Sequence, residues 1–151
     1  MTITFRRATQ DDLPHLIQLL ADDPLGAGRE DPSHPINPKY LDAFAAIDAD
    51  TNQLLLVAVD DQRVMGTFQL SFIPGITRTG TWRGQIEGVR VHQDYRGQGI
   101  GEQMFEWGVE ECRRRGCALV QLTTDKSRPD AHRFYDKLGF EASHIGYKRK
   151  L

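Results

Sequence analysis

The sequence has few cysteines, no long apolar run and little net charge. Its two cysteines, Cys112 and Cys117, are too few for a zinc site or a disulfide framework, so we expect a reducing, cytoplasmic setting and no metal. No run approaches the roughly 20 apolar residues that cross a bilayer, and the N-terminus lacks the apolar stretch of a signal peptide. The formal net charge of −2 gives no general attraction to nucleic acid or anionic membranes, so we expect neither as a partner.

The length of 151 residues suits one domain, which we expect to span residues 1–151. Apolar residues at alternate positions, or in short runs, predict strands, whereas apolar residues three and four apart predict helices. The expected strands cover residues 3–7, 54–59, 64–72, 82–91 and 118–123, followed by two short strands around Gly146. The expected helices cover residues 9–20, 38–48, 100–115 and 129–138.

The resulting order is β-α-α-β-β-β-α-β-α-β with a further strand at the end. It combines an antiparallel meander in the first half with a β-α-β crossover in the second. This combination predicts an α/β (α+β) domain with a mixed, mostly antiparallel sheet and helices on both faces. The run from Ala118 to Thr123 is apolar enough to predict a central strand.

A glycine-rich segment, Arg96-Gly97-Gln98-Gly99-Ile100-Gly101, lies between an apolar strand and a helix. Free N–H groups and the helix dipole make such a turn a seat for phosphate or pyrophosphate. An ordinary tight turn would also use these glycines, and the residues alone leave both readings open. The sequence has no G-x-x-x-x-G-K-[ST], and it fails the G-x-G-x-x-G dinucleotide pattern because the third glycine comes one residue early.

Two motifs carry a resemblance to a known family. Arg96-x-x-Gly99-x-Gly101 resembles the [RQ]-x-x-G-x-[GA] acyl-CoA signature of the GNAT superfamily of N-acetyltransferases. The segment from Asp130 to Phe140 looks like the second signature of that family, a helix that carries a tyrosine and ends in Leu-Gly-Phe. The similarity covers essentially the whole chain. It implies a GNAT fold, acetyl-CoA as co-substrate and transfer of an acetyl group to an amine.

The resemblance also implies how acetyl-CoA would bind. The glycine turn would hold the pyrophosphate, and the strand before it would pair with the pantetheine arm. In this family that strand commonly carries a bulge and splays from the next strand, and Gly88 would permit such a bulge. The expected cofactor-binding residues are Val89, Arg90, Val91, Arg96, Gly97, Gln98, Gly99, Ile100, Gly101, Asp125, Arg128 and Tyr135.

Glu87 is the expected general base. A carboxylate within the apolar run from Ile86 to Val89 is unusual in a sheet, and burial would raise its pKa toward neutrality. Family members often place a working glutamate on this strand, which favours the same role. The alternative is a glutamate on the solvent face of the strand.

Tyr135 matches the general acid of the family. A phenol can protonate a leaving thiolate when its ring is fixed beside the sulfur, although packing beside Phe134 would also explain a tyrosine here. A backbone N–H near Val89 would meet the oxyanion. Many family members carry an asparagine seven residues before the tyrosine, where this chain has Arg128, which could reach a phosphate or face solvent.

The acceptor is expected between the loop at 22–38 and the hairpin at 73–82, whose mixed charges favour a small polar amine. We therefore expect an N-acetyltransferase that works by direct attack in a ternary complex. The alternatives are a CoA-binding sensor or partner domain with little catalysis, and an interaction domain whose glycine turn is purely structural. A homodimer through exposed sheet edges is a further expectation.

Overall fold

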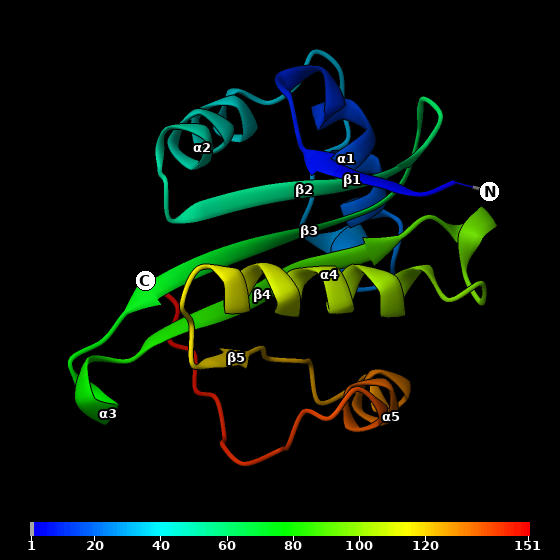
Figure 1. Ribbon diagram of the computed structural model, residues 1–151. Helices are drawn as coiled ribbons and strands as arrows, with labels where there is room; N and C mark the ends of the chain where they lie inside the picture. Colours follow the sequence, from blue (N-terminus) through cyan, green and yellow to red (C-terminus); the bar gives the residue numbers. More distant parts are fainter. Residues whose placement is uncertain (1) are drawn as a thin grey trace.

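The computed structural model describes residues 2–151 as a five-stranded sheet with helices on both faces (Figure 1). The strand order follows the sequence from β1 to β5. The first three pairings are antiparallel and the last, between β4 and β5, is parallel. The predicted mixed, mostly antiparallel sheet is confirmed. Its strands are β1 (Thr4–Arg7), β2 (Gln53–Asp60), β3 (Arg63–Pro74), β4 (Trp82–Val91) and β5 (Leu119–Gln121).

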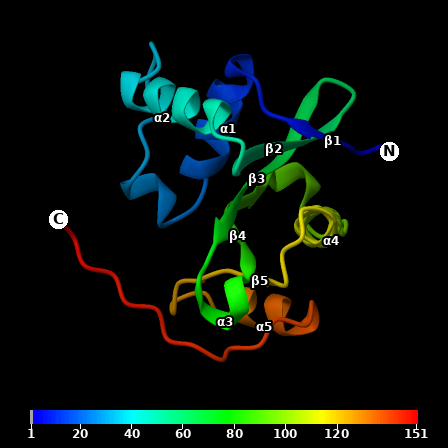
Figure 2. The same ribbon diagram turned by 60° about the vertical axis from the view of Figure 1, so that its left-hand side comes forward.

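The helices form two layers around this sheet. Helices α1 and α2 lie on one face and α4 lies on the other, as the turned view shows (Figure 2). The longer helices are α1 (Leu13–Ala21), α2 (Pro38–Ala49), α4 (Ile100–Arg114) and α5 (Pro129–Lys137). The shorter elements are α3 (Thr77–Gly80) and the 3-10 turns η1 (Gln10–Asp12), η2 (Gly26–Gly28) and η3 (Gln93–Tyr95). Among the described residues, no helix has both the length and the apolarity needed to cross a bilayer.

Two apolar clusters hold the layers together. One lies between the sheet and α4, where Phe68 and Leu70 of β3 meet Met104 and Phe105. The other lies between the sheet and α1, where Val57 of β2 packs against that helix. Strand residues alternate between the two clusters because successive side chains point to opposite faces. The predicted apolar face of α4 is confirmed by its buried residues Ile100, Met104, Phe105, Gly108 and Cys112.

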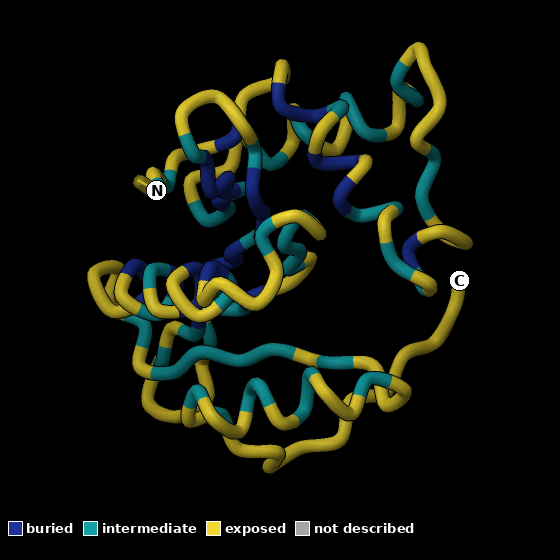
Figure 3. The backbone as a smooth tube through the Cα atoms, turned by 90° about the vertical axis from the view of Figure 1, so that its right-hand side faces the viewer, coloured by how far each residue is buried: buried dark blue, intermediate teal, exposed yellow. Residues whose placement is uncertain are grey.

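The C-terminal part of the chain contributes little to the core. None of residues 113–151 is buried, and the lower strand, helix and tail are teal or yellow in Figure 3. The expectation of a central strand at 118–123 is wrong, because β5 is an edge strand that pairs only with β4. The two strands expected around Gly146 are also wrong, since residues 140–151 have no regular secondary structure. Ile145 and Tyr147 stay largely exposed in that tail, so it gains little from burying apolar surface as a strand would.

A glycine in β4 sets how closely α4 can approach the sheet. A Cβ added at Gly84 would overlap the Sγ atom of Cys112, which is fully buried in α4. The sheet and the helix therefore lie in contact there, without room for one more methyl group. Burial also raises the pKa of the Cys112 thiol to about 12, so it stays protonated and packs as a small apolar side chain.

We therefore expect Gly84→Ala to lower the free energy of unfolding by about 1–3 kcal/mol through overpacking. Gly28→Ala is the matched control, because an added Cβ there meets nothing within 4 Å. Its effect should stay within about 0.5 kcal/mol. Urea unfolding of the three proteins measures both changes, and equal stabilities for the two variants would contradict the close approach of α4.

Candidate active site

Strands β4 and β5 separate after only three residue pairs. Their parallel register runs from Arg83 opposite Leu119 to Gln85 opposite Gln121, whereas β4 continues to Val91. On its other side, β4 stays paired with β3 along most of its length. The second half of β4 therefore has a free edge, which confirms the splay expected for this strand.

A β-bulge at Gly88 marks the start of this free edge. Thr67 pairs with Arg90 and Gln69 pairs with Glu87, so β4 uses one more residue than β3 between the two pairs. Gly88 has a φ of 65°, which glycine adopts at little cost. The predicted bulge is confirmed, and it lies where β4 leaves β5.

The backbone groups of Val89 and Val91 point toward the free edge. The N–H of His92 donates to the carbonyl of Met65 in β3 at 2.7 Å. Successive residues of a strand direct their N–H and C=O groups to alternate sides. Val91 and Val89 therefore face away from β3, where an extended ligand could pair with them as an added strand.

The turn before α4 presents a row of free backbone donors. Gly97 and Gly99 have φ values of 77° and 79°, and a Cβ added at either would meet no atom within 4 Å. The first backbone hydrogen bond into the helix runs from the Gln103 N–H to the Gly99 carbonyl at 3.1 Å. Within residues 2–151, the N–H groups from Gly97 to Glu102 have no acceptor. Together with the helix dipole, these donors suit an anion.

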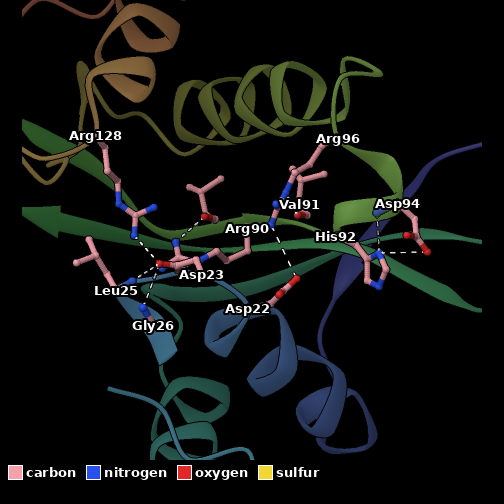
Figure 4. Close-up of polar contacts among 11 residues, drawn as sticks. Asp22, Asp23, Leu25, Gly26, Arg90, Val91, His92, Asp94, Arg96 and Arg128 are labelled. Atoms are coloured by element: carbon pink, nitrogen blue, oxygen red, sulfur yellow. Dashed lines mark hydrogen bonds and ion pairs between the residues drawn. The ribbon is translucent and has the colours of Figure 1, made fainter. Parts of the chain in front are cut away.

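Arg96 lies at the entrance to this turn, as expected. Its Nε donates to the Val91 carbonyl at 3.1 Å, and its Nη2 is 3.9 Å from Asp22 Oδ2 (Figure 4). More than half of the side chain is exposed. The guanidinium is therefore close to the free donors and accessible to the same anion.

Tyr135 lies on α5 and packs against aromatic rings. The ring centroid is 5.4 Å from that of Phe105 in α4 and 5.6 Å from that of Phe134. Burial raises the pKa of the Tyr135 phenol, and the charges of Arg128 and Arg90 offset part of the rise. Within residues 2–151, no hydrogen bond to the Tyr135 hydroxyl contributes to its pKa. A phenol that keeps its proton at neutral pH and is free to donate suits a general acid.

Glu87 is exposed, so the expectation of a buried carboxylate is wrong. Its neighbour Ile86 is buried on the face of β4 that packs against α4, and Glu87 points to the opposite face. There it accepts a hydrogen bond from Gln85 Nε2 at 3.2 Å. The carboxylate is accessible to an acceptor, next to the bulge.

Asp23, in the segment after α1, connects three separate parts of the chain. Its Oδ1 atom accepts from the N–H groups of Leu25 and Gly26 at 2.8 and 3.0 Å. The same atom accepts from Arg128 Nη2 at 2.9 Å, and Oδ2 lies 2.8 Å from Arg90 Nε (Figure 4). The contact with Arg90 is close, but its atoms are not aligned as a hydrogen bond. The contact is therefore an ion pair without a hydrogen bond.

The Asp23 carboxylate is ionised at neutral pH. Burial alone would raise its pKa, but hydrogen bonds from Gly26 and Leu25 and the charges of Arg90 and Arg128 outweigh burial and hold the pKa below its usual value. Arg128 does not simply face solvent, because its Nη2 binds a carboxylate 105 positions away, and its expected contact with a phosphate stays a prediction. No local pattern in the sequence indicates this pairing.

Asp125 shapes the turn that leads into α5. Its carboxylate accepts from the N–H of Ser127 at 2.9 Å and from the Ser127 hydroxyl at 2.7 Å. Its carbonyl oxygen is 3.1 Å from His132 Nε2. These contacts hold the turn, and the expected cofactor contact of Asp125 stays a prediction.

Amide side chains form a polar row beside Glu87, on the same face of the sheet. Gln121 Nε2 donates to Gln85 Oε1 at 2.9 Å, and Gln85 donates in turn to Glu87. Across β3, Gln69 Nε2 donates to Gln53 Oε1 at 2.9 Å. The signal was present in the sequence as polar residues at alternate positions of apolar strands. This face offers hydrogen-bonding groups to a polar acceptor.

Two acids of the 22–38 loop, which was expected to form part of the acceptor site, are engaged within that loop. Glu30 Oε1 accepts from the Tyr40 hydroxyl at 3.0 Å. Asp31 accepts from Ser33 and from Asn37 Nδ2. Both carboxylates therefore stabilise the 22–38 loop.

Comparisons with known proteins agree with this geometry. Residues 14–140 match the acetyltransferase (GNAT) family. Aminoalkylphosphonate N-acetyltransferase of Salmonella typhimurium strain LT2 is 35% identical over 112 residues, which cover 74% of this chain and 72% of that protein. Glucosamine 6-phosphate N-acetyltransferase of Trypanosoma brucei brucei is 41% identical over 81 residues, which cover 53% of this chain and 52% of that protein.

A solved structure is also similar over its whole length. It is a Bacillus halodurans C-125 protein described as a transcriptional regulator, 48% identical, with a TM-score of 0.97 and coverage of 99% of this chain and 100% of that one. The family match spans far more than half of the chain. The chain therefore belongs to the acetyltransferase (GNAT) family, and it is an N-acetyltransferase.

The glycine turn generates a paired prediction. We expect Gly99→Ala to weaken coenzyme A binding at least about 10-fold, because the new Cβ enters the space in front of the free donors. Gly116→Ala at the other end of α4 is the control, since its φ of 83° and open surroundings match those of Gly99. Both variants should lose about 1–2 kcal/mol of stability through the left-handed backbone. Calorimetric titration that finds equal affinities for the two would contradict an anion seat at this turn.

Proposed function

We propose that the protein transfers the acetyl group of acetyl-CoA to the primary amine of a small polar molecule, by direct attack in a ternary complex. The observation that carries this proposal is the opening between β4 and β5. The anion-binding turn lies at one end of its free edge, and Glu87 lies at the other, next to the bulge.

The residues present fit coenzyme A. The six N–H groups from Gly97 to Glu102 form a cradle that the missing Cβ atoms of Gly97 and Gly99 leave open. A diphosphate carries the charge and the acceptor oxygens that these donors suit. The backbone of Val89 and Val91 would pair with the amide groups of the pantetheine arm, which places the thioester near the bulge.

Glu87 would receive the proton of the amine. An alkylammonium is a much weaker acid than a carboxylic acid, so the transfer would pass through a bridging water or begin from an amine that is already neutral. The exposed position of Glu87 allows either route. The N–H of Val89 would donate to the developing oxyanion, and the Tyr135 hydroxyl would protonate the leaving thiolate.

The names of two relatives support a small, polar acceptor. One acetylates aminoalkylphosphonates and the other acetylates glucosamine 6-phosphate, as their names state. The polar row around Gln85 and Gln69 would suit such a molecule. Release of free thiol from acetyl-CoA with a panel of primary amines tests the proposal. No release with any amine would contradict it.

The second candidate is a CoA-binding sensor or partner domain with little catalysis. The description of the Bacillus halodurans protein as a transcriptional regulator favours it. Calorimetry and the thiol assay together separate the two candidates, since the sensor binds acetyl-CoA but releases no thiol.

The acid role of Tyr135 makes a quantitative prediction. Tyr135→Phe should lower kcat about 100-fold, at the lower end for a general acid because a thiolate is a good leaving group. The affinity for acetyl-CoA should change little. Because burial raises the pKa of Tyr135, the proton should stay available well above neutral pH, and the parent should lose activity only above about pH 10. Tyr147→Phe is the control, since that ring is 91% exposed in the tail. Equal kcat values for parent and Tyr135→Phe would remove the acid role.

The base role of Glu87 makes a separate prediction. Glu87→Gln keeps the shape of the side chain and should lower kcat roughly 10- to 100-fold, most strongly at low pH, where the acceptor amine is most fully protonated. Glu106→Gln, on the exposed side of α4, should leave the pH profile of the parent unchanged. A Glu87→Gln profile that superimposes on the parent across the pH range would rule out the base role.

A further inference from the structure

Two arginines from distant parts of the chain meet at the splayed end of the sheet. Arg90 is on β4, and Arg128 lies just before α5. Both lie against Asp23, with side chains that are 15% and 33% exposed (Figure 4). The three residues are called the Asp23 cluster below.

The Asp23 cluster has a net charge of +1. Asp23 supplies one negative charge against two guanidinium groups, and its own pKa is lowered, so it remains ionised. Of two other acids nearby, Asp22 faces Arg96. Asp125 interacts with the charge of Arg128, but it is exposed and bonded to Ser127, so water screens its charge. A half-buried cation without a counterion is costly. A second anion would therefore be bound favourably here.

The two arginines of the cluster also present N–H groups to which a ligand could bind. Arg90 Nη1 donates to the Val89 carbonyl at 2.8 Å, and Arg90 Nε lies against Asp23. Arg128 Nη2 donates to Asp23. In the part of the chain that the structure describes, Arg90 Nη2 and the Nε and Nη1 atoms of Arg128 have no acceptor. Asp23 is itself fixed by the N–H groups of Leu25 and Gly26. It thus orients two guanidinium groups and leaves their remaining N–H groups for a ligand.

The Asp23 cluster lies beside the proposed reaction centre. The charges of both arginines lower the pKa of the Tyr135 phenol against the effect of burial, so both act on the proposed acid. Arg90 and Glu87 are on one face of the sheet, because their partners Thr67 and Gln69 are two residues apart on β3. Along β4 their Cα atoms are at most about 10 Å apart. One small molecule can contact both side chains.

We infer that Arg90 and Arg128 bind an anionic group of the acceptor, so that the preferred substrate is a short amine bearing a phosphonate, phosphate or carboxylate. Its amine lies at Glu87 and its anion lies at the two guanidinium groups. Asp23 holds both arginines in place and acts as a positioning residue. This inference rests on the proposed function and assigns its acceptor.

The test compares short primary amines with and without an anionic group. Thiol release is measured for 2-aminoethylphosphonate, O-phosphoethanolamine and β-alanine against ethanolamine, which shares the primary amine and lacks the anion. The parent should have a kcat/KM at least about 10-fold higher for one of the anionic amines than for ethanolamine, and the three anions show which oxyacid fits best.

Two variants then assign the preference to residues. Arg90→Gln and Arg128→Gln should each lower the ratio of kcat/KM between the best anionic amine and ethanolamine about 10- to 100-fold, mostly through KM for the anionic amine. Lysine at either position should restore part of the ratio, because the charge returns without the planar fork. Arg83→Gln, seven positions earlier on β4, is the matched control and should keep the parental ratio.

The outcomes separate this inference from the proposed function. Thiol release at equal kcat/KM with charged and uncharged amines, or variants that lower both values equally, would overturn the inference and leave the acetyltransferase reaction standing. Should the glutamine variants not fold, the lysine variants test the same preference, and their ratio should lie below that of the parent. Competition against the acceptor by methylphosphonate on the parent protein gives an independent result: inhibition is expected, and none at saturating concentration contradicts the inference.

Discussion

The separation of β4 from β5 is the constraint on which the site depends. Backbone N–H and C=O groups in a sheet normally find partners on both sides, yet β4 keeps only β3 beyond Gln85. The bulge at Gly88 turns the strand at this point, and the backbone of Val89 and Val91 is left facing the opening. A ligand rich in amide groups can complete this edge. In the proposed complex the glycine turn, which follows the same strand, would bind the phosphates and so set the direction in which the ligand lies along this edge.

The Asp23 cluster connects three parts of the chain near this opening. A single carboxylate connects the segment after α1 with β4 and with the start of α5. β4 forms one side of the opening, and α5 follows the strand on its other side, so the ion pairs connect the two sides through Asp23. The same contacts gather positive charge beside Glu87 and Tyr135. In the proposed reaction, backbone donors would bind the cofactor, and arginine side chains would select the acceptor.

Local signals in the sequence predicted the parts of the site that depend on local conformation. The positive φ of Gly88, Gly97 and Gly99 follows from what glycine permits, so bulge and turn could be anticipated. The apolar face of α4 followed from its periodicity. Glu87 was misjudged because an apolar run does not reveal that one face of a strand is left uncovered. The Asp23–Arg128 pair joins residues 105 positions apart. The apolar residues Ile145 and Tyr147, on which strands after Phe140 were expected, stay exposed, and local periodicity does not show whether a strand finds a partner.

The most direct test of the central claim is amide hydrogen exchange with and without acetyl-CoA. Within residues 2–151, the N–H groups of Val89, Val91 and residues 97–102 have no partner, so they should exchange rapidly in the free chain. Acetyl-CoA should slow all of them together, while amides already bonded within β2 and β3 change little. Binding of acetyl-CoA that leaves exchange in these two segments unchanged would contradict the account, because the cofactor would then lie elsewhere.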